Sequence, residues 1–205
     1  MKSFIFKPWK AEWIARLKPG ELFMTRRPLK PQPKQIGDAC WKWKDRESLI
    51  GYLNFACDVA KTNSMYPHED IVYVKEAWRA HVSYNLYSPS KLPHDVRIFF
   101  EDHTISGRKR SPLFLPARFA RSFFKVVEVG VERVQDISQK DCYLEGVKPI
   151  YNYLQFAMGD VRGEKNKDSE LDVFSMAWDE LYICQPDLQW SANPWVWVYT
   201  LEKLP

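Results

Sequence analysis

The run LFMTRRPLKPQP extends from Leu22 to Pro33, and the run VYVKEAW extends from Val72 to Trp78. In the first run a strand leads into Pro28, where the fixed φ angle and the missing N–H end it and keep the following residues extended. Alternation in the second run places Glu76 on one face with two valines and a tryptophan. Both faces of this second strand begin apolar, which is typical of a strand in the interior of a sheet.

The patterns around these two runs predict the other elements. Strands are expected at 21–27, 71–78, 96–100, 122–134 and 195–201, and helices at 11–17, 47–61, 138–146 and 169–181. Gly130 interrupts the valine-rich strand and predicts a bulge or a bend there. No glycine-rich turn from a strand into a helix is present, which argues against a doubly wound dinucleotide fold. The order predicts a mixed α/β domain built around a small curved sheet or barrel, with short helices.

Length and composition favour one well-packed domain. A chain of 205 residues, 45% hydrophobic and 15% aromatic, can bury a substantial core but is too short for two large domains. We therefore expect a single domain over residues 1–205. Irregular insertions are expected near residues 38–66, 79–116 and 150–168.

The charge is mildly basic and partly clustered. A formal net charge of +4 does not by itself identify a nucleic-acid-binding protein. Basic residues gather at 26–34, 108–110 and 118–121, and a local surface for an anion is compatible with this grouping. Scattered, solvated charge is an equally good explanation.

The spacing of cysteines and histidines predicts no metal site, and we expect no cofactor. The four cysteines form no CxxC pair, and the four histidines form no HxH or HxxxH pattern. No apolar signal segment follows Met1, and no apolar run is long enough to span a bilayer. We expect a cytoplasmic protein without a membrane partner.

Thr25 and Glu76 are the candidate catalytic residues. A carboxylate among apolar side chains is costly unless it is paired, so Glu76 is a candidate general base or ligand acceptor. A structural ion pair with an arginine from another strand explains Glu76 equally well. Thr25 shares its strand face with Phe23 and Arg27. Its hydroxyl can bind a ligand or act as a nucleophile, or the residue is simply a good strand former.

Basic and aromatic residues supply the candidate ligand-binding groups. The planar forks of Arg26 and Arg27 suit phosphate or carboxylate, although adjacent arginines also occur in surface ion pairs. Arg118 and Arg121 alternate with rings in a pattern that suits base stacking together with phosphate contact. Trp78 adds a stacking surface or belongs to the core.

Seven short motifs follow one another along the chain. They are FIFKP at 4–8, TRR followed by KPQP within 25–33, VKEAW at 74–78, LP before the basic turn at 115–121, VERVQDIS at 131–138, LEG at 144–146 and NPWVWV at 193–198. In this order they resemble the ASCH domains of the PUA-like superfamily, in particular those encoded by phages and prophages. The resemblance spans nearly the whole chain but not the insertions. It implies a PUA-like small β-barrel with flanking short helices and a cleft for RNA or a nucleotide.

Some small ASCH proteins are amidohydrolases that deacylate acetylated cytidine with a lysine, a threonine and a glutamate. By this resemblance the threonine corresponds to Thr25 and the glutamate to Glu76. The lysine position, three residues before the threonine, holds Leu22, which supplies neither charge nor proton. Lys18 replaces that lysine only if the segment 19–20 folds back toward the pocket.

Three functions follow as expectations. The first is binding of RNA, another single-stranded nucleic acid or a nucleotide in a cleft. The expected cleft is formed by Thr25, Arg27, Glu76 and Trp78 and rimmed by Arg26, Lys30, Arg118 and Arg121. The second is deacylation of a modified nucleoside such as acetylcytidine, and the third is a phage structural or host-interaction role on a reused fold. The resemblance places the protein in the cytoplasm of a bacterial host or a phage-infected cell, and the oligomeric state stays open.

Overall fold

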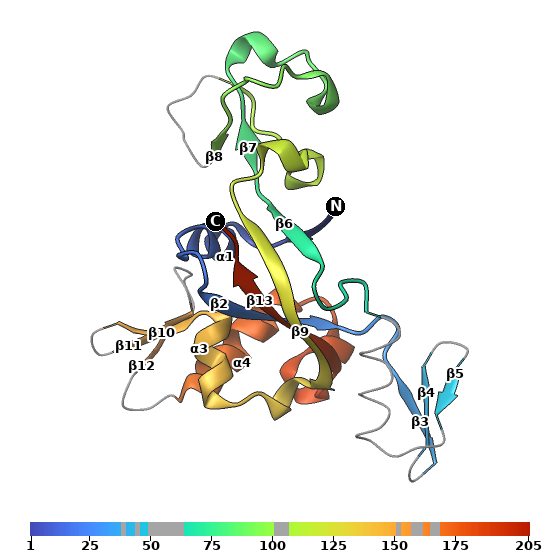
Figure 1. The fold of residues 1–205 in the computed structure, drawn as a ribbon. Coiled ribbons are helices and arrows are strands. Elements are labelled where there is room, and N and C mark those ends of the chain that lie inside the picture. The colour runs from blue at the N-terminus through green and yellow to red at the C-terminus, as the bar shows by residue number, and fades with distance from the viewer. Residues whose placement is uncertain are drawn as a thin grey trace.

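One five-stranded sheet organises the chain, and the mixed α/β class is confirmed (Figure 1). The computed structural model describes residues 1–37, 40–43, 46–48, 64–100, 107–150, 153–156, 162–164 and 169–205. The strands lie in the order β1 (Lys2–Ile5), β6 (Ile71–Lys75), β9 (Phe123–Arg133), β13 (Trp195–Lys203) and β2 (Leu22–Pro28). β1 and β6 run parallel, whereas each other neighbouring pair is antiparallel.

Smaller sheets and helices complete the described elements. The small sheets contain β3 (Lys34–Gly37), β4 (Cys40–Trp43) and β5 (Arg46–Ser48); β7 (Trp78–Arg79) and β8 (Phe99–Phe100); and β10 (Val147–Ile150), β11 (Tyr153–Phe156) and β12 (Arg162–Glu164). The α-helices are α1 (Pro8–Ala15), α3 (Gln139–Glu145) and α4 (Glu170–Leu181). Short 3-10 helices occur at Val82–Tyr84, Pro89–Lys91, Pro112–Phe114, Ala117–Phe119, Val134–Asp136, Pro186–Leu188 and Trp190–Ala192. None of the described helices has the length and apolar character that a membrane crossing requires.

The predicted strands match the large sheet closely. The expected strands at 21–27, 122–134 and 195–201 are β2, β9 and β13, and the run at 71–78 divides into β6 and β7. β6 lies between β1 and β9, which confirms its predicted interior position. Of the strand expected at 96–100, the last two residues form β8. β1 was not predicted, because four residues are too few to show a clear alternation.

The helix predictions are accurate near the C-terminus and less so elsewhere. The helices expected at 138–146 and 169–181 are α3 and α4, each capped by the serine that precedes it. α1 begins at Pro8, three residues before the predicted start, because proline suits the first helical position. The helix expected at 47–61 lies outside the described residues, except that Glu47 and Ser48 belong to β5.

Of the bulge or bend predicted at Gly130, the bulge is not found there, although β9 does contain a bulge elsewhere. Gly130 pairs in register with Val198 of β13. The register shifts instead where Thr200 pairs with Glu128 and the next residue pairs with Val126, which leaves Val127 as the extra residue. The bulge in β9 is therefore formed at a valine, Val127, and not at a glycine.

The main apolar core lies between the sheet and the helices. α1 packs Trp13 and Ile14 toward Phe23 of β2, whose ring meets that of Phe124 edge to face at 4.8 Å. The same cluster continues into α4 through Phe174. Helices on the sheet thus bury aromatic side chains contributed by four separate elements.

The sheet has two free edges, β1 and β2, and the described residues form no backbone ladder between them. Arg27 joins these edges, since its Nη2 donates a 2.6 Å hydrogen bond to the carbonyl oxygen of Ile5. The guanidinium also lies over the Phe6 ring, 4.8 Å from its centroid. A charged side chain thus occupies the gap between the two edges.

The described part of residues 76–121 forms a separate projection, here called the β7–β8 lobe. Figure 1 shows it extending from the end of β6, away from α3 and α4. Trp78 and Leu115, both almost fully buried, form its small core with Leu92. The predicted insertion at 79–116 falls within this lobe, and those at 38–66 and 150–168 fall on the small sheets or outside the described residues.

Candidate functional site

A cavity of about 370 Å³ lies beside β2 and is here called the β2 cavity. It is lined by Ile5, Phe6, Lys7, Pro8, Lys10, Thr25, Arg26, Arg27, Glu145, Phe174, Trp178, Leu181 and Tyr182. These residues come from β1, α1, β2, α3 and α4 and from the link between β1 and α1. Charged groups and aromatic rings therefore line the same space.

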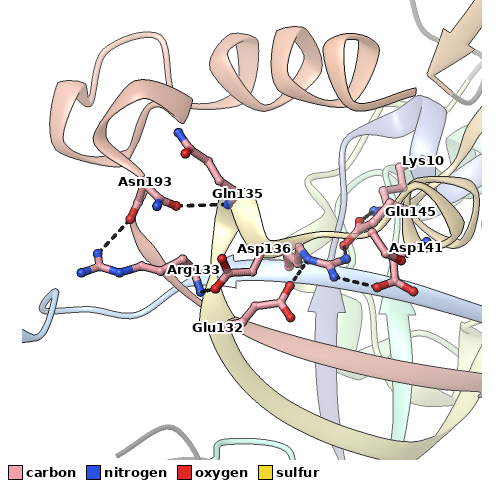
Figure 2. A network of polar contacts seen from close by, with 10 residues as sticks. Lys10, Glu132, Arg133, Gln135, Asp136, Asp141, Glu145 and Asn193 are labelled. Carbon is pink, nitrogen blue, oxygen red and sulfur yellow. Dashed lines mark hydrogen bonds and ion pairs between the residues drawn. The ribbon is translucent and has the colours of Figure 1, made fainter. Parts of the chain in front are cut away.

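Arg26 is buried at this cavity in a network of carboxylates. Figure 2 labels its three carboxylate partners, Glu132, Asp141 and Glu145. Its Nε donates to Glu132 at 2.7 Å, its Nη1 to Glu145 at 3.3 Å and its Nη2 to Asp141 at 3.3 Å. Burial opposes the charge of the guanidinium, but Glu145, Glu132 and Asp141 outweigh that effect and raise its pKa. Arg26 was predicted to lie on an exposed rim; this is wrong, because only 1% of its side chain is accessible.

Lys10 enters the same network from α1. Its Nζ donates to Glu145 at 2.7 Å, so this carboxylate accepts from two buried cations (Figure 2). Burial lowers the pKa of the Lys10 ammonium; Glu145 opposes the shift, and the charges of Arg27 and Arg26 reinforce it. The β2 cavity therefore contains a lysine that loses its proton at a lower pH than a solvated lysine does.

Thr25 and Arg27 lie where the strand alternation places them. Thr25 is buried on the Phe23 face of β2 and lines the β2 cavity. Arg27 lines the cavity as well, and its polar contact is a carbonyl oxygen rather than a carboxylate. Lys7 contributes a fourth cation at the cavity wall, beside Lys10, Arg26 and Arg27.

The opposite wall of the cavity is aromatic and firmly held. Trp178 donates its indole N–H to the carbonyl of Leu188 at 2.7 Å, and its ring lies 4.7 Å from that of Tyr182. Phe174 packs against Trp178 with ring centroids 6.1 Å apart. Burial raises the pKa of the Tyr182 hydroxyl, while Arg27 opposes the shift, so this hydroxyl stays protonated near neutral pH. The wall offers a fixed apolar surface for a ring.

A second cavity of about 420 Å³ lies at the base of the lobe and is here called the β7 cavity. It is lined by Phe6, Pro8, Ala11, Glu76, Ala77, Trp78, Arg79, Lys109 and Pro112. Phe6 and Pro8 line both cavities, which therefore lie on either side of one chain segment. The single cleft expected around Thr25 and Glu76 is thus divided into two cavities.

Glu76 is a member of a structural ion pair. It accepts two hydrogen bonds from Arg121, from Nε at 2.9 Å and from Nη2 at 2.7 Å. Arg121 also lies over the ring of Phe100, 4.7 Å from its centroid. Of the two explanations that the sequence left open for Glu76, the pairing with an arginine from another segment is the one observed.

Two of the other predicted residues lie away from the β2 cavity. Lys18 is exposed and lines neither the β2 nor the β7 cavity, so it does not join Thr25 there. Leu22 is 43% exposed and is also absent from both walls. Trp78 is 1% exposed, within the core of the lobe, and lines the β7 cavity.

The expected basic rim does not form one surface. Arg118 belongs to the lobe, where it donates to the carbonyls of Pro89 and Leu92. Lys30 lies near Gln185, beside a third cavity of about 720 Å³. Arg26 is buried at the β2 cavity. These cations therefore lie in three separate parts of the molecule.

Sequence reasoning missed Lys10, Glu145 and the aromatic wall of α4. Glu145 belongs to the LEG motif, which indicated only a helix end. The spacing of Phe174 and Trp178 predicted the helix but not which cavity the helix would cover. Lys10 stands in a sequence with no distinctive pattern, so only the packing of α1 reveals its position.

Among the described residues, no group of three or more His, Cys, Asp or Glu side chains is arranged to hold a metal ion. Comparison of the chain with models of protein families, with curated proteins and with solved structures gives no match.

Proposed function

We propose that the β2 cavity binds a small ligand that carries a ring, in particular an anionic nucleotide or, as a neutral alternative, a modified nucleoside. The observation that supports this most directly is the environment of Arg27. Its guanidinium lines the cavity, and its partners are a neutral carbonyl and an aromatic ring. An arginine fork held in this way retains its charge for a phosphate or carboxylate ligand.

The balance of charge in the cavity favours an anion. Arg26 and Lys10 share three carboxylates, those of Glu132, Asp141 and Glu145, so these five side chains together have a charge of −1. No carboxylate among the described residues pairs with Lys7 or Arg27. These two cations bring the net charge around the cavity to +1, which attracts an anionic group.

The size and the aromatic wall favour a ring. A volume of about 370 Å³ falls within the range of small-molecule sites, about 300–1,000 Å³. Tyr182, at the C-terminal end of α4, presents a partly exposed ring on which a nucleobase can stack, and the buried ring of Trp178 lies 4.7 Å from it. A PUA-like architecture of the ASCH type is part of this proposal, supported by the sheet order and by the Arg27 link between β1 and β2.

Calorimetric titration of the purified protein with nucleoside monophosphates tests this proposal. Arg27→Gln should weaken binding about 10- to 100-fold, because a charge-assisted hydrogen bond contributes about 1.5–3 kcal/mol. Lys7→Gln should weaken binding in the same direction while leaving the Arg27 link to Ile5 intact. Lys18→Gln is the matched control, since Lys18 is exposed and outside the cavity.

Absence of binding to the wild-type protein at millimolar ligand would refute the proposal. An equal loss of affinity in Lys7→Gln and Lys18→Gln would also refute it, because it would indicate only a general charge effect.

A second candidate function, deacylation of an amide such as acetylcytidine, is favoured by Lys10. Leu22 occupies the position at which the similar hydrolases have a lysine. The β2 cavity nevertheless contains a lysine, Lys10, which comes from α1. Lys10 and Thr25 line the same space, with Glu145 as the carboxylate in place of Glu76. The lowered pKa of Lys10 makes its amine a better general base near neutral pH than a solvated lysine.

The proposed reaction has two steps. The neutral amine of Lys10 takes the proton of the Thr25 hydroxyl, whose oxygen forms an ester with the acyl carbon as the C–N bond breaks. Lys10 then passes the proton to the leaving amine. Water hydrolyses the ester, which releases the carboxylic acid and restores the hydroxyl.

Incubation with acetylcytidine tests this second function. Thr25→Val and Lys10→Met should each lower kcat by at least about 100-fold, the usual scale of a lost acid–base group. The rate should rise with pH and level off below the pKa of about 10.4 of a free lysine, because the base must be neutral. Turnover that survives both substitutions, or that depends on Glu76 alone, would exclude these roles.

A further inference from the structure

We propose that the nucleotide in the β2 cavity is one unit of a single-stranded nucleic acid, and that the β7–β8 lobe binds the strand flanking it. This inference rests on the proposed function and extends it from a small ligand to a polymer. It assigns a role to the β7 cavity and to the charge of the lobe, which nucleotide binding alone leaves unexplained.

The two cavities are neighbours, with one chain segment between them. Both are lined by Phe6 and Pro8, so a chain leaving the β2 cavity needs to pass only this segment to enter the β7 cavity. There it meets Arg79 and Lys109.

The excess positive charge of the protein lies in the lobe. Residues 76–121 contain eight lysines and arginines and four aspartates and glutamates, a net charge of +4. The whole chain also has a net charge of +4, so all other residues together are neutral. Such concentration of charge in one projection is the electrostatic pattern expected of a surface for a polyanion.

Several of these cations are positioned without being neutralised. Arg79 donates to the carbonyl of Gly107 at 2.6 Å, and Arg118 donates to that of Leu92 at 3.1 Å. A carbonyl oxygen holds a guanidinium group in place without offsetting its positive charge. The carboxylate of Glu76, in contrast, offsets the charge of Arg121. Arginines that only stabilise the fold do not require positive charge in excess of the nearby carboxylates. The excess charge at these contacts therefore favours binding of an external anion.

Exposed rings beside the cations favour a nucleic acid over an acidic peptide. Phe114 is 62% and Tyr87 47% exposed. The Arg118 guanidinium lies over the ring of Phe119 at 4.6 Å. Rings of this kind stack on bases in proteins that bind single strands, while arginines and lysines contact the phosphates.

The test compares two probes, uridine monophosphate and a labelled oligouridylate of about 12 nucleotides, within the site sizes of about 4–16 nucleotides known for single-strand binding folds. The variant is Arg108→Ala combined with Lys109→Ala, two exposed cations of the lobe. The control removes the same charge elsewhere by combining Lys34→Ala with Lys140→Ala, which are also exposed. Binding is measured at several salt concentrations by fluorescence anisotropy for the oligouridylate and by calorimetry for the monophosphate.

We expect the oligouridylate to bind wild type more tightly than the monophosphate. The lobe variant should lose oligouridylate affinity but keep that for the monophosphate. Its slope of log affinity against log salt should fall in magnitude by about 1.4, about 0.7 for each lost phosphate contact on a single strand. The control variant should change far less.

Three results would overturn the inference while leaving the β2 cavity as a nucleotide site: equal affinity for both probes, equal losses in the lobe and control variants, or displacement of the oligouridylate by polyglutamate of the same charge. Failure of the monophosphate to bind wild type would instead refute the proposed function, and with it the assignment of the polymer to that cavity.

Discussion

Arg26 and Arg27 are neighbours in the sequence, yet their guanidinium groups have opposite environments. Both line the β2 cavity, but Arg26 donates to three carboxylates, whereas Arg27 has a carbonyl and a ring as partners. The neighbouring elements explain the difference, because β9 brings Glu132 and α3 brings Asp141 and Glu145 to Arg26. One arginine therefore stabilises the fold, and the other is available to a ligand.

Replacement of Arg26 should be strongly destabilising. Arg26→Met leaves Glu145 buried with Lys10 as its remaining partner, and loss of one partner from a buried ionic group costs about 3–5 kcal/mol. The free energy of unfolding, measured by urea denaturation, should fall by about that amount. Arg16→Met, in an exposed helical pair with Glu12, should cost less than about 0.5 kcal/mol. A loss below about 1 kcal/mol for Arg26→Met would show that the network is not a structural centre.

The sequence predicted which residues share a strand face, but not what covers each face. Thr25 and Phe23 were correctly placed together, and both are buried. The burial of Arg26 could not be foreseen, because Asp141 and Glu145 come from a helix more than 110 residues later. Lys10 was missed for the same reason, since its partner Glu145 is also remote in the sequence.

At the level of elements, the KPQP segment connects β2 to β13 through one side chain. Gln32 donates to the carbonyls of Leu29 and Trp195, and it accepts from the backbone N–H of Trp195 at 2.7 Å. Because Trp195 is fully buried at the start of β13, its N–H cannot turn to water instead. The polar residue between two prolines thus fixes where the last strand begins.

Gln32→Ala should lower the free energy of unfolding by about 1–3 kcal/mol, because it leaves a buried backbone donor unsatisfied. Gln35→Ala, an exposed change in β3, should alter stability by less than about 0.5 kcal/mol. Chemical denaturation of both variants distinguishes them. If the two variants unfold alike, Gln32 does not anchor β13.

Elements with strong internal patterns were predictable, and elements that depend on remote contacts were not. The β-branched run of β9 and the capped, periodic α4 were located within one or two residues. β1 has four residues and finds its place only by pairing with β6. The bulge in β9 lies at Val127, which has no distinctive local signal, because the register with β13 determines it.

For the whole molecule, the sheet, the two cavities and the lobe belong to one arrangement. The chain between β1 and α1 separates the β2 cavity from the β7 cavity, so residues expected in one cleft lie in two. Sequence motifs identified Thr25 and Glu76 as notable, but their separation depends on how Phe6 and Pro8 are placed in space. The lobe then adds an uncompensated positive surface beyond the second cavity.

A crystal structure of the protein with a bound nucleoside monophosphate tests the central claim most directly. We expect the phosphate within hydrogen-bonding distance of Arg27 and the base against the ring of Tyr182. A ligand found in the β7 cavity beside Glu76, or on the surface with the β2 cavity vacant, would contradict the claim that the β2 cavity is the binding site.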